Sequence, residues 1–358
     1  MSDTPARTDP HGPSPAMRTD APTDPSPSGS SNADRPTIGP SYRLRSLFIA
    51  ASLIAAIALP ALVSDYRLFQ FTQVWITAIA LLGLNLLTGW CGQVSLGHGA
   101  FFAIGAYCSA LLMSHAGMPD WLTLIPCALL CLGAGWLFGL PAARLEGLYL
   151  ALATFALALA LPQILKHRLL EPFTGASQGL ALDVALAPTG WPFSATTWHY
   201  TLAVGTLLVM TIVAHRLTRG HLGRAMRALR DHPIAATANG IDSRALKAKV
   251  FGISAMFAGI SGGLSAIVVR YVGPDSFDMF LSISFLVGIV IGGLASIPGS
   301  LLGAIFIQFV PHAAEQVSRE AAWAIYGVFL LIALWLMPAG LAGLVRDVRR
   351  CVRSPARD

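Results

Sequence analysis

The chain has 358 residues, of which 54% are apolar and only 12% are charged, and its formal net charge is +6. Soluble domains carry about a quarter charged residues, so this composition excludes an ordinary water-soluble protein. Repeated apolar runs of roughly 18 residues or more indicate an integral membrane protein. Because the basic residues gather in loops and tails, their charge indicates how helices are oriented in a membrane and argues against nucleic-acid binding.

The N-terminal segment, residues 1–40, is rich in Pro, Ser, Asp and Thr and has almost no large apolar side chain. Such a composition cannot bury enough apolar surface to fold, so we expect a disordered tail. It does not form a signal peptide, because the first apolar run starts only near Leu47. Met1 and Met17 are both candidate starts of translation.

Residues 41–346 predict an all-α, polytopic bundle of about ten transmembrane helices, followed by a short basic tail over residues 347–358. The candidate spans are residues 47–63, 71–87, 94–113, 121–140, 148–165, 198–214, 249–272, 279–297, 299–313 and 321–341. Two of them, 94–113 and 299–313, are short or rich in glycine, and we expect these to be broken or re-entrant.

The distribution of charge predicts on which side each loop lies. Eight of the 24 lysines and arginines fall within residues 215–249, which therefore form a large cytoplasmic loop. Counting spans from this loop places both termini in the cytoplasm. The predicted outer loops then hold acidic residues such as Asp120 and Asp275, with Lys166 as one of a few basic exceptions.

The stretch that runs from Gly92 into the third candidate span contains an unusual series of glycines and polar residues. The glycines are Gly92, Gly97, Gly99 and Gly105, and the polar residues between them include Gln93, Ser95 and His98. Glycine at membrane depth is tolerated where the backbone is covered by protein or lines a cavity. The run therefore indicates either tight packing, with His98 forming a structural hydrogen bond between helices, or the lining of a pathway.

The cytoplasmic loop 215–249 begins with a basic helix. Arg224, Arg227 and Arg230 recur every three residues, which places them on one helix face. Pro233 disfavours helical geometry at the preceding residue, so we expect this helix to end near His232. A solvated loop that only orients the neighbouring spans is the alternative interpretation.

A second, shorter helix is predicted after this break. We expect Asp231 to cap it, Pro233 to lie in its first turn, and Gly240 to end it in the left-handed conformation. Its small residues are Ala235, Ala236 and Ala238. The expected helix is short and has a small surface that fits a groove on a partner.

Small residues recur at helical spacing within the predicted spans. The pairs Gly259 with Gly263 and Gly288 with Gly292 are GxxxG motifs, and Gly135 with Gly139 and Gly299 with Gly303 repeat the pattern. Such faces let helix backbones approach closely in a membrane. We expect them to pack helices together, and a sliding motion along these faces is the alternative.

The chain lacks the motifs of common catalytic and nucleotide-binding sites. No GxxxxGK[ST] sequence occurs, so the chain should not hydrolyse ATP by itself. No Ser-His-Asp or Cys-His arrangement indicates hydrolysis, and the cysteines lack metal-ligand partners. No Asp or Glu lies inside a confident span, which weakens a proton-driven carrier, although sodium coupling through backbone oxygens stays open. We expect no catalytic residue, no metal and no cofactor in this chain.

Three stretches together carry a family resemblance. They are GLNLLTGWCGQVSLGHGAFFAIGAY (83–107), GRAMRALRDHPIAATANGID (223–242) running on into KAKVFGISAMFAGISGGLSA, and IVIGGLASIPGSLLGA (289–304). In this order and spacing the chain resembles the permease subunits of branched-chain amino acid ABC importers, of the LivM type. The resemblance covers about residues 71–346.

The resemblance implies a subunit of the bacterial inner membrane that forms half of a heterodimeric channel with a second, related permease. Two cytoplasmic ATPase subunits would bind ATP-Mg and drive transport, and a periplasmic binding protein would deliver the substrate. Family substrates are leucine, isoleucine and valine, while relatives transport urea, short amides or other small acids. A stand-alone carrier or channel is the alternative, and a membrane-bound enzyme or scaffold has no supporting site.

The resemblance assigns a role to the loop motif, while the role of the glycine-rich run is expected from its own residues. The residues expected to couple to the ATPase are Arg227, Arg230, Asp231, Ala235, Ala236, Asn239 and Gly240. Those expected along the translocation path are Gln93, Ser95, Gly97, His98 and Gly99, where helix ends would hold the charged groups of an amino acid. The sequence departs from the family pattern at Glu146 and Ala339, where basic residues are usual, and in the loop FTGASQGL (173–180). These departures leave the substrate open.

Overall fold

The computed structural model describes residues 63–182, 194–318, 321–336 and 340–343, all within a unit that spans Ser52–Asp358. The tails expected at residues 1–40 and 347–358 lie outside the described residues, as does nearly all of the first predicted span, 47–63.

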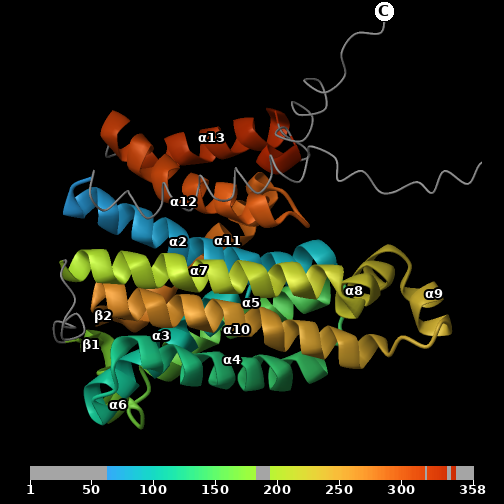
Figure 1. Cartoon of the computed structure of the whole chain (residues 1–358), viewed down its shortest axis with the longest axis horizontal. Coiled ribbons are helices and arrows are strands. Elements are labelled where there is room, and N and C mark those ends of the chain that lie inside the picture. Colours follow the sequence, from blue (N-terminus) through green and yellow to red (C-terminus); the bar gives the residue numbers. More distant parts are fainter. Residues whose placement is uncertain (1–62, 183–193, 319–320, 337–339, 344–358) are drawn as a thin grey trace, which may run out of the picture. The chain divides into compact units, whose positions relative to one another are not determined.

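Helices form nearly all of the regular structure in the described part of the chain (Figure 1). The first long helices are α2 (Asp65–Asn85), which continues into a π-helical turn (Leu86–Trp90), α3 (His98–Ala116), α4 (Asp120–Ala142) and α5 (Leu148–Leu165). After the short α6 (Glu171–Thr174) and a 3-10 turn (Ala176–Gln178) come α7 (Ala195–Arg219), α8 (His221–Asp231), α9 (Pro233–Ala238) and α10 (Ser243–Val269). A 3-10 turn (Pro274–Phe277) leads to α11 (Met279–Gly292), α12 (Ile297–Val317) and α13 (Ala322–Leu336).

Eight of these helical segments are long and apolar enough to cross a membrane. They correspond to eight of the predicted spans, and α13 lies within a ninth, 321–341. The all-α, polytopic fold class is therefore confirmed. The expectation of a broken or re-entrant segment is wrong for 299–313, because α12 is a continuous helix long enough to cross a membrane. The stretch 94–113 begins with the non-helical residues 94–97 and then continues as the unbroken α3.

The centre of the bundle is formed by α10 and α2. In both helices 72% of the most apolar stretch is buried, compared with 22% in α7. Helix α10 packs on α4, α3 and α2, and in Figure 1 it runs alongside α4 and α7. Its apolar side chains are buried because neighbours cover it on several sides, which is the arrangement expected for a helix that is hydrophobic all round.

Glycines explain how closely these helices approach. A Cβ atom on Gly105 of α3 would overlap the backbone of Gly259 in α10, so only a hydrogen fits there. A Cβ on Gly259 would also overlap the side chain of Cys131 in α4. In α11, Cβ atoms on Gly288 and Gly292 would meet α12, and the latter would overlap the backbone of Gly299. The predicted pairs Gly259 with Gly263 and Gly288 with Gly292 thus lie at helix contacts. Gly263 is the least crowded of the four, because a Cβ atom there would make only ordinary van der Waals contacts.

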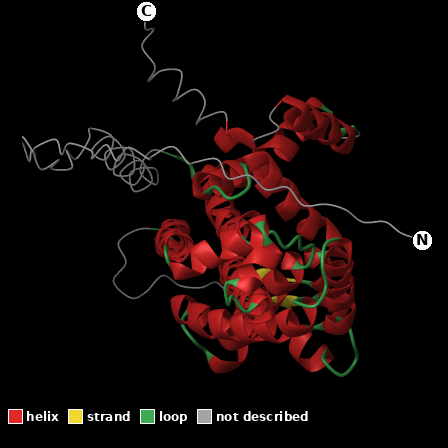
Figure 2. Cartoon of the chain, turned by 90° about the vertical axis from the view of Figure 1, so that its right-hand side faces the viewer, coloured by secondary structure: helices red, strands yellow, loops and turns green. Residues whose placement is uncertain are grey.

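The loops contact one another in the way the charge pattern predicts. A two-stranded antiparallel sheet pairs β1 (Leu180–Ala181), in an expected outer loop, with β2 (Tyr271–Val272), at the outer end of the predicted span 249–272, and Figure 2 shows how small it is beside the helices. An ion pair joins Lys166 to Asp275 on the same side. At the other end, Lys247 of α10 pairs with Glu146 of the α4–α5 loop at 3.1 Å. These contacts join only loops that the sequence places on one side.

Candidate functional site: an exposed loop helix and a buried helix connection

Helix α8 lies against the bundle on one face and is open to solvent on the other. Gly223, Met226 and Leu229 are buried, while Arg224 and Arg227 are exposed. This division follows from the alternation of apolar and basic residues at helical spacing. The arginine face predicted from the sequence is thus solvent-exposed, and Figure 1 shows α8 and α9 at the end of the neighbouring long helices.

Helix α9 begins at Pro233, as expected, but Asp231 does not cap it. The N-cap position belongs to His232, whose backbone is extended (φ −146°, ψ 84°), and no side chain caps the helix. Asp231 is instead the last residue of α8, and its carboxylate accepts a hydrogen bond from Arg230 Nε at 3.0 Å. The expectation was wrong because the proline shifts only the residue directly before it out of the helix.

The end of α9 is built as the sequence predicts. Gly240 adopts a left-handed backbone with φ +82°, and the amide of Ile241 donates to the carbonyl oxygen of Ala236. Asn239 Nδ2 donates to the carbonyl oxygen of Ala235 at 2.8 Å. A six-residue helix is too short to be stable alone, so these end contacts help to hold it.

The surface of α9 differs from the expected small-residue surface in two ways. Ala235 and Ala238 are exposed, but Ala236 is only 4% exposed and packs against the rest of the chain. Ile234, which was not among the predicted coupling residues, is 86% exposed. Its sequence signal was an isolated large apolar residue directly after the helix-starting Pro233. The most apolar feature that α9 presents to solvent is therefore an isoleucine.

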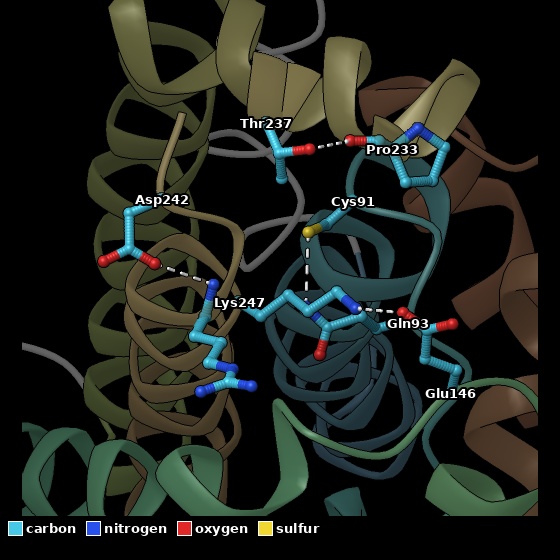
Figure 3. A network of polar contacts seen from close by, with 8 residues as sticks. Cys91, Gln93, Glu146, Pro233, Thr237, Asp242 and Lys247 are labelled. Atoms are coloured by element: carbon cyan, nitrogen blue, oxygen red, sulfur yellow. Dashed lines mark hydrogen bonds and ion pairs between the residues drawn. The ribbon is translucent and has the colours of Figure 1, made fainter. Parts of the chain in front are cut away.

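The second candidate region is the connection from α2 to α3. Helix α2 ends in the π-helical turn Leu86–Trp90, a rare feature that is frequent at functional sites. Gly92 then turns the chain with φ +76°, and the amide of Gln93 donates back to the carbonyl oxygen of Leu87. The side chain of Gln93 is buried and donates to Cys91 Sγ at 3.3 Å. Figure 3 shows this turn in one view with Pro233 and Thr237 of α9.

The next residues form buried hydrogen bonds to several helices. Ser95 Oγ lies 3.2 Å from His98 Nδ1, and His98 Nε2 lies 2.6 Å from Ser254 Oγ in α10. The amide of Leu96 donates to Thr154 Oγ1 in α5. The amide of Gly97 donates to Ser95 Oγ, and that of Gly99 to Ser282 Oγ in α11. This connection therefore joins α5, α10 and α11.

These contacts occupy the groups that were expected to meet a substrate. Ser95 and His98 are almost fully buried, and both ring nitrogens of His98 have hydroxyl partners. Ser254 lies eleven residues after the start of α10 at Ser243, a rise of about 16 Å, so His98 packs against the apolar part of α10 and not against its charged first turns. In this conformation the region binds helices together, and its role in the translocation path stays a prediction.

Asn85 is the residue that sequence reasoning missed in this region. It is completely buried, and its Nδ2 donates to the carbonyl oxygen of Ser296 and to Ser300 Oγ, each at 3.0 Å. Its Oδ1 accepts from the amide of Ala295 at 2.8 Å. Ala295 has φ +54°, so Asn85 holds a strained turn between α11 and α12. A lone Asn inside the apolar stretch GLNLLTG was the available signal.

Comparison with known proteins gives the relatives of this chain. A family model described as the permease component of branched-chain amino acid transport systems matches residues 66–334. The chain is 32% identical over 347 residues to the high-affinity branched-chain amino acid transport system permease protein LivM of Escherichia coli strain K12, covering 90% of this chain and 80% of the relative. LivM of Salmonella typhimurium is 32% identical over 336 residues, covering 87% and 78%.

A second kind of relative is more distant. The permease protein LivH of Escherichia coli strain K12 is 23% identical over 285 residues, covering 74% of this chain and 91% of the relative. No solved structure matches the chain. These relatives are transport permeases, which agrees with the helical spans of the structure. The chain therefore belongs to the family of permease components of branched-chain amino acid transport systems, as a multi-pass inner-membrane transport subunit and not an enzyme.

Proposed function

We propose that this subunit forms half of the translocation path of an ATP-driven importer for branched-chain or similar small amino acids, and that α9 docks onto a cytoplasmic ATPase subunit. The observation that carries the docking proposal is the exposed Ile234 on a short helix. This helix lies within the loop 215–249, which holds eight of the 24 lysines and arginines and which charge places in the cytoplasm. Because the sequence has no P-loop, we place the ATP-binding site of the importer on another chain.

The free energy of docking would come largely from this apolar residue. Moving a fully exposed isoleucine into an apolar groove stabilises a complex by roughly 1.5–3 kcal/mol. Ala235 and Ala238 are exposed beside it and leave room for a partner to approach closely. Gly240 and Asn239 hold the end of the helix, so the partner meets a surface that is already formed.

The other partners follow from the relatives. Both LivM and LivH permeases match this chain, which supports a pair of related permeases, of which this chain is the LivM-like member. We further propose two ATPase subunits that bind ATP-Mg and a periplasmic binding protein that delivers the substrate. The second permease would complete the path, because the described residues of this chain hold no open channel lined by Gln93, Ser95 or His98.

The substrate is proposed as a branched-chain amino acid because the relatives are named for that transport. Few charged side chains lie inside the spans, so an apolar side chain of the substrate would be tolerated. Urea, short amides or other small acids are the alternative within the same family. The ligand found in the partner binding protein would decide between them.

The experiment is to purify the chain with the permease and ATPase subunits encoded beside it and reconstitute the complex in liposomes. ATP hydrolysis and uptake of labelled leucine are measured with and without loaded binding protein. We expect loaded binding protein to stimulate hydrolysis and uptake together. Uptake by this chain alone under an ion gradient, with no effect of ATP, would show that it is a secondary carrier.

A further inference from the structure

Arg230 contacts the membrane helices and not only the solvent. Its Nη1 donates to the carbonyl oxygen of Gly89 at 2.6 Å, across 141 residues of sequence. Its Nε donates at the same time to Asp231 at 3.0 Å. The planar guanidinium group is thereby held in one orientation between α8 and the end of α2.

The carbonyl oxygen of Gly89 is a favourable place for a positive charge. The last carbonyl groups of a helix lack partners within the helix, and Gly89 lies in the π-helical turn that ends α2. The partial negative charge at a helix C-terminus also attracts a cation. Arg230 therefore acts as a cap for α2 that is supplied by another helix.

The aliphatic part of the Arg230 side chain also packs against the turn that follows α2. A Cβ atom built on Gly92 would lie 2.8 Å from Arg230 Cγ, so the absence of a side chain at Gly92 makes room for the arginine. The same turn contains Cys91 and Gln93 and leads directly into the buried segment that ends at His98. Arg230 thus contacts the end of α2 at Gly89 and the start of the α2–α3 connection at Gly92.

Gly89 also contacts the loop between α11 and α12. A Cβ atom on Gly89 would overlap Asn85 Oδ1 and the amide nitrogen of Ala295. Asn85 in turn is hydrogen-bonded to Ala295 and Ser296. A shift of α8 would therefore be passed through Arg230 to Gly89, and from there to two connections between spans.

We propose that Arg230 is a positioning residue that links the docking of α9 to the α2–α3 and α11–α12 connections. This inference rests on the proposed docking of an ATPase at α9, but it assigns a different task to Arg230. The resemblance groups Arg230 with the residues that meet the ATPase. Its contacts place its guanidinium against Gly89, so its loss should impair transmission while the ATPase subunits stay bound.

The test uses the full reconstituted complex with the substitution Arg230→Met, which keeps the apolar stem and removes the donors. Arg224→Met is the matched control, because it removes the same charge from the same helix face and its guanidinium contacts His221 within α8 at 2.9 Å. For each variant we measure how much ATPase subunit co-purifies, the stimulation of hydrolysis by loaded binding protein, and the uptake per ATP hydrolysed.

We expect Arg230→Met to keep its ATPase subunits and to lose stimulation and uptake per ATP by about tenfold, the size expected for one hydrogen bond made by a charged donor. Arg224→Met should differ from the unmodified complex by less than about twofold. Equal uptake per ATP in both variants would overturn the inference, and so would loss of the ATPase subunits from Arg230→Met, which would mean that Arg230 belongs to the docking surface.

A further variant keeps the test decisive if Arg230→Met does not accumulate in the membrane. Arg230→Lys keeps a charge and a donor but cannot hold Asp231 and Gly89 with a planar fork, so we expect an intermediate loss of uptake per ATP. If Arg230→Lys showed the same uptake per ATP as the unmodified complex, the two simultaneous hydrogen bonds of the guanidinium group to Asp231 and Gly89 would not be needed. An unmodified complex that is not stimulated by any loaded binding protein would instead contradict the proposed function itself.

Discussion

The buried connection from α2 to α3 and the exposed helix α9 are built on opposite principles. In the connection, the polar groups of Ser95 and His98 are enclosed and bonded to neighbouring helices. In α9, the hydrogen bonds of Thr237 and Asn239 stay within the helix, and Ile234 projects into solvent. The polar groups of the α2–α3 connection hold helices in place, while α9 leaves the apolar side chain of Ile234 exposed, where a partner can contact it.

The difference has a physical cause. A polar group at membrane depth has no water to bond, so it must find a protein partner or cost several kcal/mol. A loop outside the membrane has water for its polar groups, and an apolar side chain on it is the unusual feature. Substitutions in the buried connection should therefore reduce stability, and substitutions of exposed side chains on α9 such as Ile234 should reduce assembly without changing stability.

The largest loss of stability is expected for Asn85→Leu. The substitution keeps the size of the side chain but leaves the amide of Ala295 without this partner, while the carbonyl oxygen of Ser296 keeps its bond from the amide of Ser300. The unsatisfied amide costs roughly 1–3 kcal/mol, and the lost bonds to Ser296 and Ser300 add about 1 kcal/mol each, so we expect a total of about 3 kcal/mol or more. The thermal unfolding midpoint in detergent measures this. Thr206→Val is the control, because its hydroxyl bonds only within α7, and an equal loss in both variants would contradict the account.

A smaller loss is expected for Gly105→Ala, because the added methyl group would push α3 away from α10 at Gly259. Overpacking of this kind costs roughly 1–3 kcal/mol. The control is Gly133→Ala in α4, where the new methyl group meets open space and helix propensity should raise stability by up to about 1 kcal/mol. The same detergent unfolding assay compares the two, and a neutral Gly105→Ala would show that the helices are less closely packed than described.

His98→Ala should cost about 1–2 kcal/mol, because two hydrogen bonds are lost while the serine hydroxyl groups can turn to other acceptors. Ser254 keeps its bond to the carbonyl oxygen of Gly83. Uptake is measured per assembled complex, so that a loss of abundance is separated from a loss of transport. Unchanged transport together with unchanged abundance would remove His98 from the translocation path.

Glu146→Gln should have the smallest effect. The ion pair with Lys247 has a length of 3.1 Å, but the Glu146 side chain is 80% exposed and screened by water. Such pairs contribute at most about 1 kcal/mol, so we expect a shift in the unfolding midpoint of a few degrees at most. A large loss of stability would show that this loop contact matters as much as the buried connection.

Much of this structure follows from the sequence because its signals are local. Apolar runs predict the spans, and Gly240 predicts the end of α9, since both depend on neighbouring residues. Asn85 was missed because its role depends on partners more than 200 residues away in the chain. A break over 299–313 was wrongly expected because Gly299 and Gly303 serve close packing between helices, which a single sequence does not distinguish from a break.

The surface of α9 was predicted only in part for a similar reason. Helical spacing does not tell which of Ala235 and Ala236 turns toward the bundle, and the structure buries Ala236. A bulky replacement of Ala236 would therefore disturb the packing of α9 itself and would not isolate the docking surface. Gly240→Val would likewise strain the turn at φ +82°. Ile234 is the better position for testing the docking proposal, because its side chain is 86% exposed among the residues that the structure describes.

The central claim is that α9 docks the ATPase, and co-purification of the ATPase subunits with Ile234→Asp tests it most directly. Ala228→Asp is the control, because it adds the same charge at an exposed position of α8. We predict that Ile234→Asp reaches the membrane in normal amounts but retains about tenfold less ATPase, as expected from losing a buried isoleucine, while Ala228→Asp retains it. Full retention of the ATPase by Ile234→Asp would contradict the docking of α9.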